Sequence, residues 1–395
     1  MTLSDDTDWR ARLSSLEVPL SVSDNPVLSS CLDRLIEIGR LSREDGIRLM
    51  NEKSIIGLSS LADMVKRARF DNRVFYNRNL HVNTTNICVL ACRFCAFRKG
   101  PKHSDAYELS PDQFVDRISP YASNIDEVHS VGGLHPEWRV EEYATIFSTI
   151  KNEFSHIQIK ALTAIEIIHI SKRSGLSIKS TLGILKDAGL DSIPGGGAEI
   201  LVDAVRDKIC RGKESSEEYL EVHSIAHRLG LPTNCTMLFG TVESISDRIT
   251  HLIKLREQQD LSGGFQCFVP YPFLPDFSRL PEAQLATSSE VVRMIAVSRL
   301  MLDNIPHIKA YRMNLGDHLS SICLNTGADD IDGTVGHEEI MHDAGSTARM
   351  DTPENGLINL IISSGSLPIR RNSTYDEYME VELDESSINL PVLRG

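Results

Sequence analysis

The feature of this sequence that most restricts its fold is a regular alternation of β-prone and amphipathic helical segments across residues 81–335. Most of the β-prone segments are followed by a stretch whose apolar side chains recur at helical spacing. Strands that alternate with helices pair in parallel, because each helix carries the chain back to the same end of the sheet. The predicted strands lie at residues 81–89, 126–133, 156–163, 190–196, 233–240, 264–271, 307–314 and 329–335.

Eight parallel strands are the number that closes a (β/α)8 barrel, and we therefore predict an α/β protein of the TIM-barrel type. An open doubly wound sheet stays open as the alternative. We expect residues 1–75 to form an N-terminal helical segment, residues 76–345 the barrel, and residues 346–395 a C-terminal extension. That extension is predicted to contain a helix and a polar surface tail at residues 375–387.

Composition limits the partners and the compartment. The 395 residues are 41% hydrophobic and carry a formal net charge of −14, which argues against nucleic acid or an anionic membrane as the main partner. No run approaches 18 consecutive apolar residues, and the N-terminus lacks the pattern of a signal peptide. We therefore expect a cytoplasmic protein, in a reducing compartment where clustered thiols bind metal or take part in catalysis.

Three of the eight cysteines lie within one short segment, with the spacing C-x3-C-x2-C and Phe94 directly before the last of them. These are Cys88, Cys92 and Cys95. Three thiolates can bind three irons of a cubane cluster and leave the fourth iron open to an outside ligand. A structural zinc site is the competing interpretation, but it needs a fourth protein ligand, and the chain has no second C-x2-C pair.

The residues around the thiols fit an anionic cofactor. Basic side chains are concentrated there, at Arg93, Arg98, Lys99 and Lys102, and would favour thiolate ligands and nearby anions. A solvated basic loop is the simpler interpretation of the same residues. The other cysteines are predicted to be buried structural thiols, at Cys31, Cys210, Cys235, Cys267 and Cys323.

Glycines and polar residues gather where the predicted strands end. In barrels of this type the active site is built from the loops that follow the strands. Gly132 and Gly133 follow the second strand, Thr163 and Glu166 the third, Glu199 the fourth, and Gly240 and Glu243 the fifth. The convergence of these residues predicts a site at that end of the barrel.

The cysteine spacing, with its aromatic residue and its place after the first strand of a βα barrel, resembles the radical S-adenosylmethionine (SAM) superfamily. The resemblance implies a [4Fe-4S] cluster held by the three cysteines, with SAM on the open iron and reductive cleavage of SAM to a 5′-deoxyadenosyl radical. It also implies that Phe94 contacts the adenine and that Gly132 and Gly133 receive the methionine amino group. Glu199 would meet the ribose or the amine, and Arg206 the methionine carboxylate, unless they are surface residues; Thr163 is placed with this cofactor-binding group.

Longer strings, among them "NICVLACRFCAF", "SVGGLHPEW", "LDSIPGGGAEI" and "GADDIDGTV", are similar to the aminofutalosine synthase family of menaquinone biosynthesis over about residues 60–345. This resemblance implies addition of the adenosyl radical to 3-[(1-carboxyvinyl)oxy]benzoate, an enolpyruvyl benzoate, giving 6-amino-6-deoxyfutalosine, methionine and bicarbonate or CO2. Dehypoxanthine futalosine cyclase and the radical components of the deazaflavin-cofactor synthase, which abstract hydrogen, share parts of the strings and stay open as alternatives. A flavodoxin or ferredoxin is the electron donor that the resemblance implies.

The implied substrate carries two carboxylates, so its pocket needs cations or oriented hydrogen-bond donors. The candidates at predicted strand ends are Asn83, His135, Gln266, Tyr271 and Arg312. His135 and Arg312 are the predicted catalytic residues, with a structural role for His135 and solvent exposure for Arg312 as the alternatives. A purely structural iron–sulfur or zinc protein would not need these strand-end groups.

Overall fold

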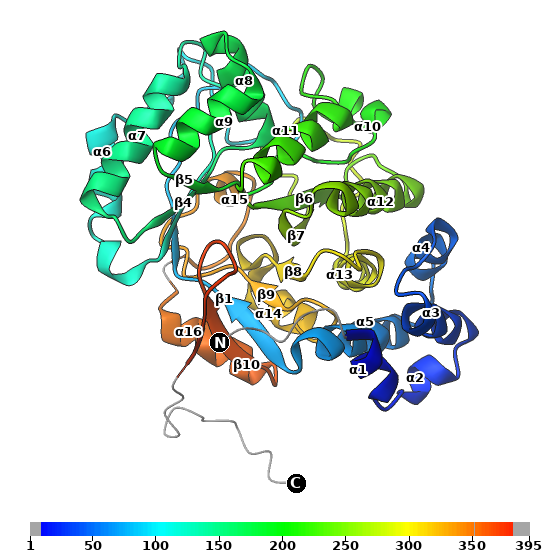
Figure 1. Ribbon diagram of the computed structural model, residues 1–395. Coiled ribbons are helices and arrows are strands. Elements are labelled where there is room, and N and C mark those ends of the chain that lie inside the picture. Colours follow the sequence, from blue (N-terminus) through cyan, green and yellow to red (C-terminus); the bar gives the residue numbers. More distant parts are fainter. Residues whose placement is uncertain (1–8, 351, 382–395) are drawn as a thin grey trace.

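The computed structural model describes residues 9–350 and 352–381, and it confirms the predicted α/β barrel (Figure 1). The barrel strands follow one another in chain order and pair in parallel, from β2 to β5 in one sheet and from β6 to β9 in the other. A parallel bridge between Ile193 and Thr233 joins the two sheets. The strands are β2 (Asn79–His81), β3 (Glu127–Ser130), β4 (Gln158–Ala161), β5 (Leu190–Ser192), β6 (Thr233–Phe239), β7 (Phe265–Pro272), β8 (His307–Ala310) and β9 (Asp330–Ile331).

The first barrel strand is displaced from its predicted position. β2 ends at His81, where the prediction placed a strand over residues 81–89. Asn86 and Thr85 explain the difference, because they fix the following chain as a loop: Asn86 Oδ1 accepts from Tyr107 N, and Thr85 Oγ1 donates to Tyr107 O. The cysteine segment therefore lies on an irregular loop above the strand.

Helices cover the outside of the barrel, and many begin with a Ser or Thr whose side chain caps the first turn. Reciprocal capping boxes occur at Thr163–Glu166, Ser215–Glu218 and Thr287–Glu290, and this pattern is readable in the sequence. The helices that follow the N-terminal segment are α6 (Pro111–Ile118), α7 (Val140–Glu153), α8 (Ala164–Ser174), α9 (Ile178–Asp187), α10 (Asp203–Ile209), α11 (Ser216–Arg228), α12 (Ile245–Ser262), α13 (Ser288–Met301), α14 (Arg312–Cys323), α15 (Ile340–Asp343) and α16 (Glu354–Ser363), of which α15 lies at the mouth of the barrel.

The N-terminal segment is helical, as predicted, and adds a layer outside α12 and α13 (Figure 1). α5 packs along α13, while α4 contacts both α12 and α13. The segment consists of α1 (Trp9–Ser15), α2 (Leu20–Ser23), α3 (Pro26–Glu37), α4 (Arg43–Met50) and α5 (Ile55–Phe70). In the part of the chain that the structure describes, no helix combines the length and the apolar character that a membrane span requires.

The sheet extends beyond the barrel through strands from both ends of the chain. β1 (Arg73–Tyr76) pairs in parallel with β9 and with β10 (Leu367–Arg371), and β10 pairs antiparallel with β11 (Tyr378–Glu380). At the seam between β9 and β2, Thr334 Oγ1 accepts from Asn79 N and donates to Asn79 O. Strand pairing thus crosses both expected domain boundaries, and the division into three parts stays a prediction.

The turn between β10 and β11 closes the bottom of the barrel. The Ser373 carbonyl accepts a hydrogen bond of 2.9 Å from Lys160 Nζ, and Ser373 N donates to Gln158 Oε1 at 2.7 Å. Gln266 Nε2 donates to the Thr374 carbonyl. Tyr375 is only 9% exposed, so the predicted surface tail is wrong for its first residue; residues 382–387 of that tail lie outside the described residues.

A buried ion pair holds this turn in place. Arg371 and Asp330 are fully buried and form two hydrogen bonds, of 2.6 Å from Nε and 3.0 Å from Nη2. Lys309 Nζ lies 3.0 Å from Asp330 Oδ1, and the Arg371 guanidinium lies 3.8 Å from the centre of the Tyr375 ring. Burial alone would raise the pKa of Asp330, but Arg371 and Lys309 outweigh it and lower the pKa to about 2.

Replacing Arg371 with leucine should destabilise the protein strongly. Arg371→Leu leaves Asp330 in a dry interior with Lys309 as its nearest cation, so we expect the free energy of unfolding to fall by about 3 kcal/mol or more. Chemical denaturation followed by circular dichroism measures the loss. Arg370→Leu is the matched control, because the Arg370 side chain is 24% exposed and lies 3.4 Å from Asp126, and it should cost less than about 1 kcal/mol. Equal losses would contradict a special role for the buried pair.

Candidate functional site

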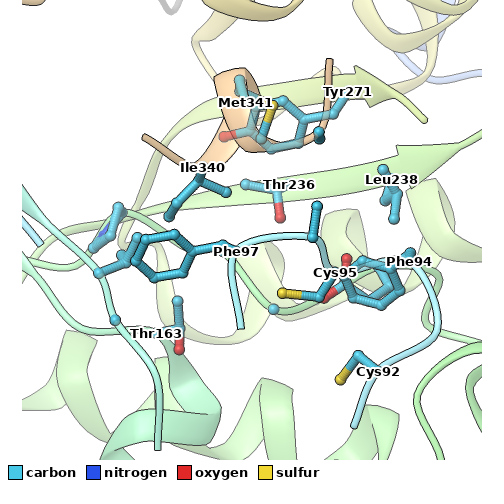
Figure 2. A pocket seen from close by; sticks show the side chains of 18 of the residues that line it. Cys92, Phe94, Cys95, Phe97, Thr163, Thr236, Leu238, Tyr271, Ile340 and Met341 are labelled. Atoms are coloured by element: carbon cyan, nitrogen blue, oxygen red, sulfur yellow. The ribbon is translucent and has the colours of Figure 1, made fainter. Parts of the chain in front are cut away.

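A deep cavity opens at the carboxyl ends of the barrel strands, as the fold predicts. It encloses about 1440 Å³ of empty space, its open mouth included. Residues from the loops after β2, β3, β4 and β5 line one side, and residues of β6, β7 and α15 line the other (Figure 2).

The three clustered cysteines all line this cavity. They are half-buried free thiols, and two of them are labelled in Figure 2. Their loop is held by Cys88 N, which donates to Lys99 O at 3.1 Å, and by Arg279, which donates to the carbonyls of Ala91 and Cys92. Burial raises the pKa of Cys92 to about 12, so this thiol stays protonated until a metal replaces its proton.

The donor set fits an iron–sulfur cubane. Across the described ranges, no three His, Cys, Asp or Glu side chains gather around one point as the ligands of a single metal ion must. A cubane instead takes each thiolate on a different iron. The basic side chains predicted near the thiols are partly engaged: Arg93 pairs with Glu282 at 2.5 Å, and Arg98 Nε donates to Cys88 O at 3.2 Å. The predicted structural cysteines are confirmed, since all five are buried: Cys31, Cys210, Cys235, Cys267 and Cys323.

Two glycines allow the loop after β3 to press against the cysteine loop. A Cβ on Gly133 would lie 2.2 Å from the Ile87 carbonyl oxygen, and a Cβ on Gly132 would lie 2.7 Å from Thr84 Oγ1. Gly133 N donates to Thr85 O at 2.8 Å, which ties the two loops together. Gly132 lines the cavity, whereas Gly133 lies behind it and packs against the chain just before Cys88.

Thr163 and Glu166 fix the edge of the cavity after β4. The Glu166 carboxylate accepts hydrogen bonds from Gly132 N at 2.9 Å, from Thr163 N at 2.7 Å and from Thr163 Oγ1 at 2.7 Å. Thr163 lines the cavity (Figure 2), while Glu166 is buried and does not line it. Burial raises the pKa of Glu166 to about 7, although these hydrogen bonds oppose the shift.

A buried ion pair between Glu199 and Lys213 lines the same side of the cavity. Lys213 Nζ lies 2.5 Å from Glu199 Oε1 and 5.9 Å from the centre of the Phe94 ring. Burial disfavours the charge on Lys213, but Glu199 and Glu214 outweigh it and hold the lysine pKa above its ordinary value. Glu199 was predicted at the site, while Lys213 was not, because it lies in a polar turn without any motif. The structure also places Phe94 in the lining, as predicted (Figure 2).

Arg206 does not line the cavity, contrary to expectation. Its Nε and Nη2 donate to the Glu214 carbonyl at 2.9 and 2.6 Å, and its Nη1 donates to the Ala198 carbonyl. The side chain is 3% exposed, and Glu214 Oε1 lies 3.3 Å from Nη2. Arg206 therefore holds the turn that presents Glu199, and its guanidinium has no donor directed at a cofactor.

His135, one of the two predicted catalytic residues, makes its hydrogen bonds within the protein. Its Nδ1 accepts from the backbone N–H groups of Glu137 and Trp138, both at 3.2 Å, and its Nε2 lies 2.7 Å from Glu108 Oε2. Both ring nitrogens are thus used, Nδ1 within the loop after β3 and Nε2 by Glu108 of the loop after β2, and the side chain does not line the cavity. These contacts agree with the alternative, structural interpretation of His135.

Arg312 and Gln266 also lie outside the cavity. Arg312 is fully buried, and its Nη1 donates to Arg349 O at 2.9 Å, so it neither faces solvent nor reaches the substrate space. Gln266 stands at the start of β7 and therefore at the bottom of the barrel. Gly240 and Glu243 form a closed turn, in which Glu243 Oε1 accepts from Gly240 N at 2.6 Å. Sequence had placed each of these residues near a strand end, but Gln266 lies at the opposite end of its strand, and Arg312 and Glu243 are engaged in contacts away from the cavity.

Other lining residues were missed because they belong to the strands themselves or to a segment far along the chain. Asn83 and Tyr271 line the cavity, as predicted. The lining residues that sequence reasoning did not single out include His81, His129, Thr236, Leu238, Tyr311, Asn314, Glu338, Ile340 and Met341. Period-two alternation within β2 and β3 could have marked the two histidines as pointing inward.

Comparisons with known proteins agree with this geometry. Residues 82–254 match the family model of the radical SAM superfamily, and residues 262–384 match that of the CofH/MqnC C-terminal region. The chain is 38% identical to the aminodeoxyfutalosine synthase of Thermus thermophilus, over 89% of this chain and 96% of that one. It is 37% identical to the aminodeoxyfutalosine synthase of Streptomyces coelicolor (87% and 92% covered) and 35% identical to the cyclic dehypoxanthine futalosine synthase of the same organism (88% of each covered).

Solved structures show the same fold at low sequence identity. Methylornithine synthase superposes with a TM-score of 0.70 at 18% identity, covering 85% of this chain and 96% of that one. The FeFe-hydrogenase maturase HydG from Carboxydothermus hydrogenoformans superposes with a TM-score of 0.69 at 15% identity, covering 94% and 84%. At these identities the likeness supports the barrel fold alone.

Gly133→Ala should remove the cluster while leaving the barrel folded. The new methyl group would collide with the Ile87 carbonyl and displace the loop that begins at Cys88. We expect iron and labile sulfide after anaerobic reconstitution to fall below about half of wild type, with an unchanged far-ultraviolet circular dichroism spectrum. Gly183→Ala is the matched control: no atom lies within 4 Å of its added Cβ, and alanine favours the helix α9. Full iron content in Gly133→Ala would show that the loop can shift without losing its ligand geometry.

Glu166 should make the stability of the protein depend on pH. The unfolded chain releases the Glu166 proton near the ordinary pKa of 4.5, whereas the folded protein keeps it to about 7. The folded state therefore binds more protons between these values, and stability falls as pH rises, by up to about 1.4 kcal/mol per pH unit. Glu166→Gln lacks this titration, so its unfolding free energy relative to wild type should increase from pH 5 to pH 7 in metal-free protein. A constant difference would contradict the assignment.

Proposed function

The chain belongs to the radical SAM superfamily, and we propose that it is an aminodeoxyfutalosine synthase. In the proposed reaction the 5′-deoxyadenosyl group of SAM is added to 3-[(1-carboxyvinyl)oxy]benzoate, and 6-amino-6-deoxyfutalosine forms. Methionine is released and the vinyl carboxylate leaves as CO2 or bicarbonate, so SAM is consumed. The observation that carries the proposal is the match to two aminodeoxyfutalosine synthases over 96% and 92% of their lengths, at higher identity than to the cyclic dehypoxanthine futalosine synthase.

The residues present fit the cofactors of this superfamily. Cys88, Cys92 and Cys95 line one cavity and would hold three irons of a [4Fe-4S] cluster, which supplies the electron that cleaves SAM. The chain's own contribution is to bind and orient SAM next to that loop. We assign this task to the lining residues Phe94, Gly132, Thr163 and Glu199, with Gly133 setting the height of the cysteine loop.

Charge and shape support this assignment. The Glu199 carboxylate can accept hydrogen bonds from ribose hydroxyls or from an ammonium group, and Lys213 holds it in position at 2.5 Å. Gly132 N donates to Glu166 at 2.9 Å, so a backbone carbonyl of this loop, and not this N–H group, would meet the methionine amine. Leu238, Ile340 and Met341 give the cavity apolar sides that exclude water from a reactive radical (Figure 2).

We further propose that a flavodoxin or ferredoxin reduces the cluster and that the reaction takes place in the cytoplasm. The thiol loop lies at the surface, where Val89 is 52% exposed, so a docked redox protein would approach the cluster closely. The proposal includes neither a nucleic acid nor a membrane as a partner, in keeping with the net charge of −14.

The reaction is tested anaerobically with reconstituted protein, dithionite, SAM and 3-[(1-carboxyvinyl)oxy]benzoate, followed by mass spectrometry. We expect an adduct that contains the adenosyl group and the benzoate, formed together with methionine. Cys92→Ala should abolish both adduct formation and iron binding. Cys31→Ala should retain both, because Cys31 is a buried thiol of α3 outside the cysteine loop. If 5′-deoxyadenosine accumulates without an adduct, the hydrogen-abstracting relatives become the better proposal.

A further inference from the structure

Two histidines form a stacked pair inside the barrel, deeper than the cysteine loop. His81 and His129 are register partners on the neighbouring parallel strands β2 and β3, so their side chains point to the same face of the sheet. Their rings stack with centroids 4.4 Å apart and an interplanar angle of 18°, and both line the cavity. No proposed step of SAM binding uses either of them.

The pair has hydrogen-bonding capacity that the protein leaves unused. His81 Nε2 lies 3.4 Å from Asn79 Nδ2. The His129 ring forms no hydrogen bond with any residue that the structure describes. An unpaired polar group on the wall of a largely apolar cavity costs the protein free energy unless a ligand or a water molecule forms a hydrogen bond with it. A ligand with an acceptor group directed at the two imidazoles would therefore be stabilised there.

The opposite side of this deep region is aromatic. Tyr271 and Tyr311 meet edge to face, with ring centroids 5.2 Å apart and an interplanar angle of 87°, and both line the cavity. Asn314, which also lines the cavity, has a buried Oδ1 without a hydrogen-bond partner in the described structure. Aromatic walls with a few polar groups are typical of a site for a flat aromatic molecule.

Charges around the histidines are already matched, so the pair can receive an anion. Glu127 lies 3.4 Å from Lys160, and Lys309 lies 3.0 Å from Asp330. Glu338, which lines the cavity, accepts hydrogen bonds from the backbone of Met341 and His342 and from the His342 ring.

Both imidazoles are neutral before a ligand binds. Burial lowers the pKa of His81 to about 3 and that of His129 to about 4. His129 lowers the pKa of His81 further, and Lys309 lowers both, whereas Glu127 raises both and Glu338 raises that of His81. Neutral rings avoid a buried charge in the empty site, and a carboxylate placed against them would favour uptake of a proton.

We propose that His81 and His129 form the floor of a second subsite, which binds the benzoate carboxylate of the substrate while its ring lies against Tyr271 and Tyr311. The inference rests on the proposed function. The enol ether must lie beside SAM, next to the cysteine loop, so the benzoate carboxylate at the other end of the molecule reaches deeper into the barrel. This subsite takes the place of His135, Arg312 and Gln266, whose side chains do not line the cavity.

The inference is tested by a binding cycle on reconstituted enzyme without reductant, so that no turnover occurs. Isothermal titration calorimetry would measure Kd for 3-[(1-carboxyvinyl)oxy]benzoate and for 2-phenoxyacrylate, which lacks only the benzoate carboxylate. In wild type we expect the second ligand to bind at least about tenfold more weakly, as the loss of a hydrogen-bonded charge implies. In His129→Leu the two ligands should bind within about threefold of each other, because their distinguishing carboxylate has lost its partner.

Further variants separate hydrogen bonding from packing. His129→Gln keeps a donor and should retain most of the wild-type preference, while His156→Ala, an exposed histidine, is the matched control. Titration in two buffers of different ionisation enthalpy should show a fraction of a proton taken up with the substrate in wild type and less in His129→Gln. An unchanged effect of SAM on the spectrum of the reduced cluster would show that each variant is folded.

The outcomes separate the subsite from the function. If His129→Leu weakens both ligands equally, or neither, the pair only packs the barrel and the inference is overturned, while adduct formation by wild type leaves the proposed function standing. If wild type forms no adduct with the substrate, the proposed function falls, and the inference falls with it.

Discussion

The close contact between the loop after β2 and the loop after β3 is the constraint on which the site depends. The cysteine loop is irregular, and its position is set by Gly132 and Gly133, whose missing side chains let Thr84 and Ile87 approach. The Glu166 carboxylate extends this contact to the loop after β4 by accepting from Gly132 and Thr163. These contacts fix three neighbouring loops relative to one another at the carboxyl ends of the strands. A cluster bound by three thiolates, with a cofactor beside it, requires ligands held in such a fixed geometry.

The interior of the barrel is divided into two regions with different chemistry. Its lower half is a dense set of buried charges, in which Arg371 pairs with Asp330 and Lys160 lies 3.4 Å from Glu127. The turn after β10 fills the bottom with Ser373 and with the Tyr375 ring. The upper half is an open cavity, and burial there lowers the pKa values of His81 and His129 and raises those of Tyr271 and Tyr311, which keeps all four side chains neutral. The C-terminal strands therefore shape the cavity without touching it.

The fold and the thiol site could be predicted because both rest on local patterns. Strand and helix periodicity indicated the barrel, and Cys88, Cys92 and Cys95 needed only their spacing. The residues of the proposed substrate subsite could be predicted only in part, since Tyr271 was a candidate at a strand end whereas His81 and His129 were not. His135 follows a glycine pair at a strand end, yet the N–H groups of Glu137 and Trp138 turn its ring away from the cavity. A position just after a strand places a residue at the end of the barrel where the cavity opens. The hydrogen bonds of the folded protein then decide whether its side chain points into the cavity.

The sequence by itself determined the parallel barrel, the capped helices and the thiol-bearing loop, since each depends on residues close together along the chain. Only the tertiary structure decided that Lys213 would pair with Glu199, that Arg206 would be used within a turn, and that His81 and His129 would stack. These contacts join residues from different turns, helices and strands, so their geometry exists only when the barrel closes. A buried polar group must form a hydrogen bond, and the packing of the core decides which residue is near enough to be its partner.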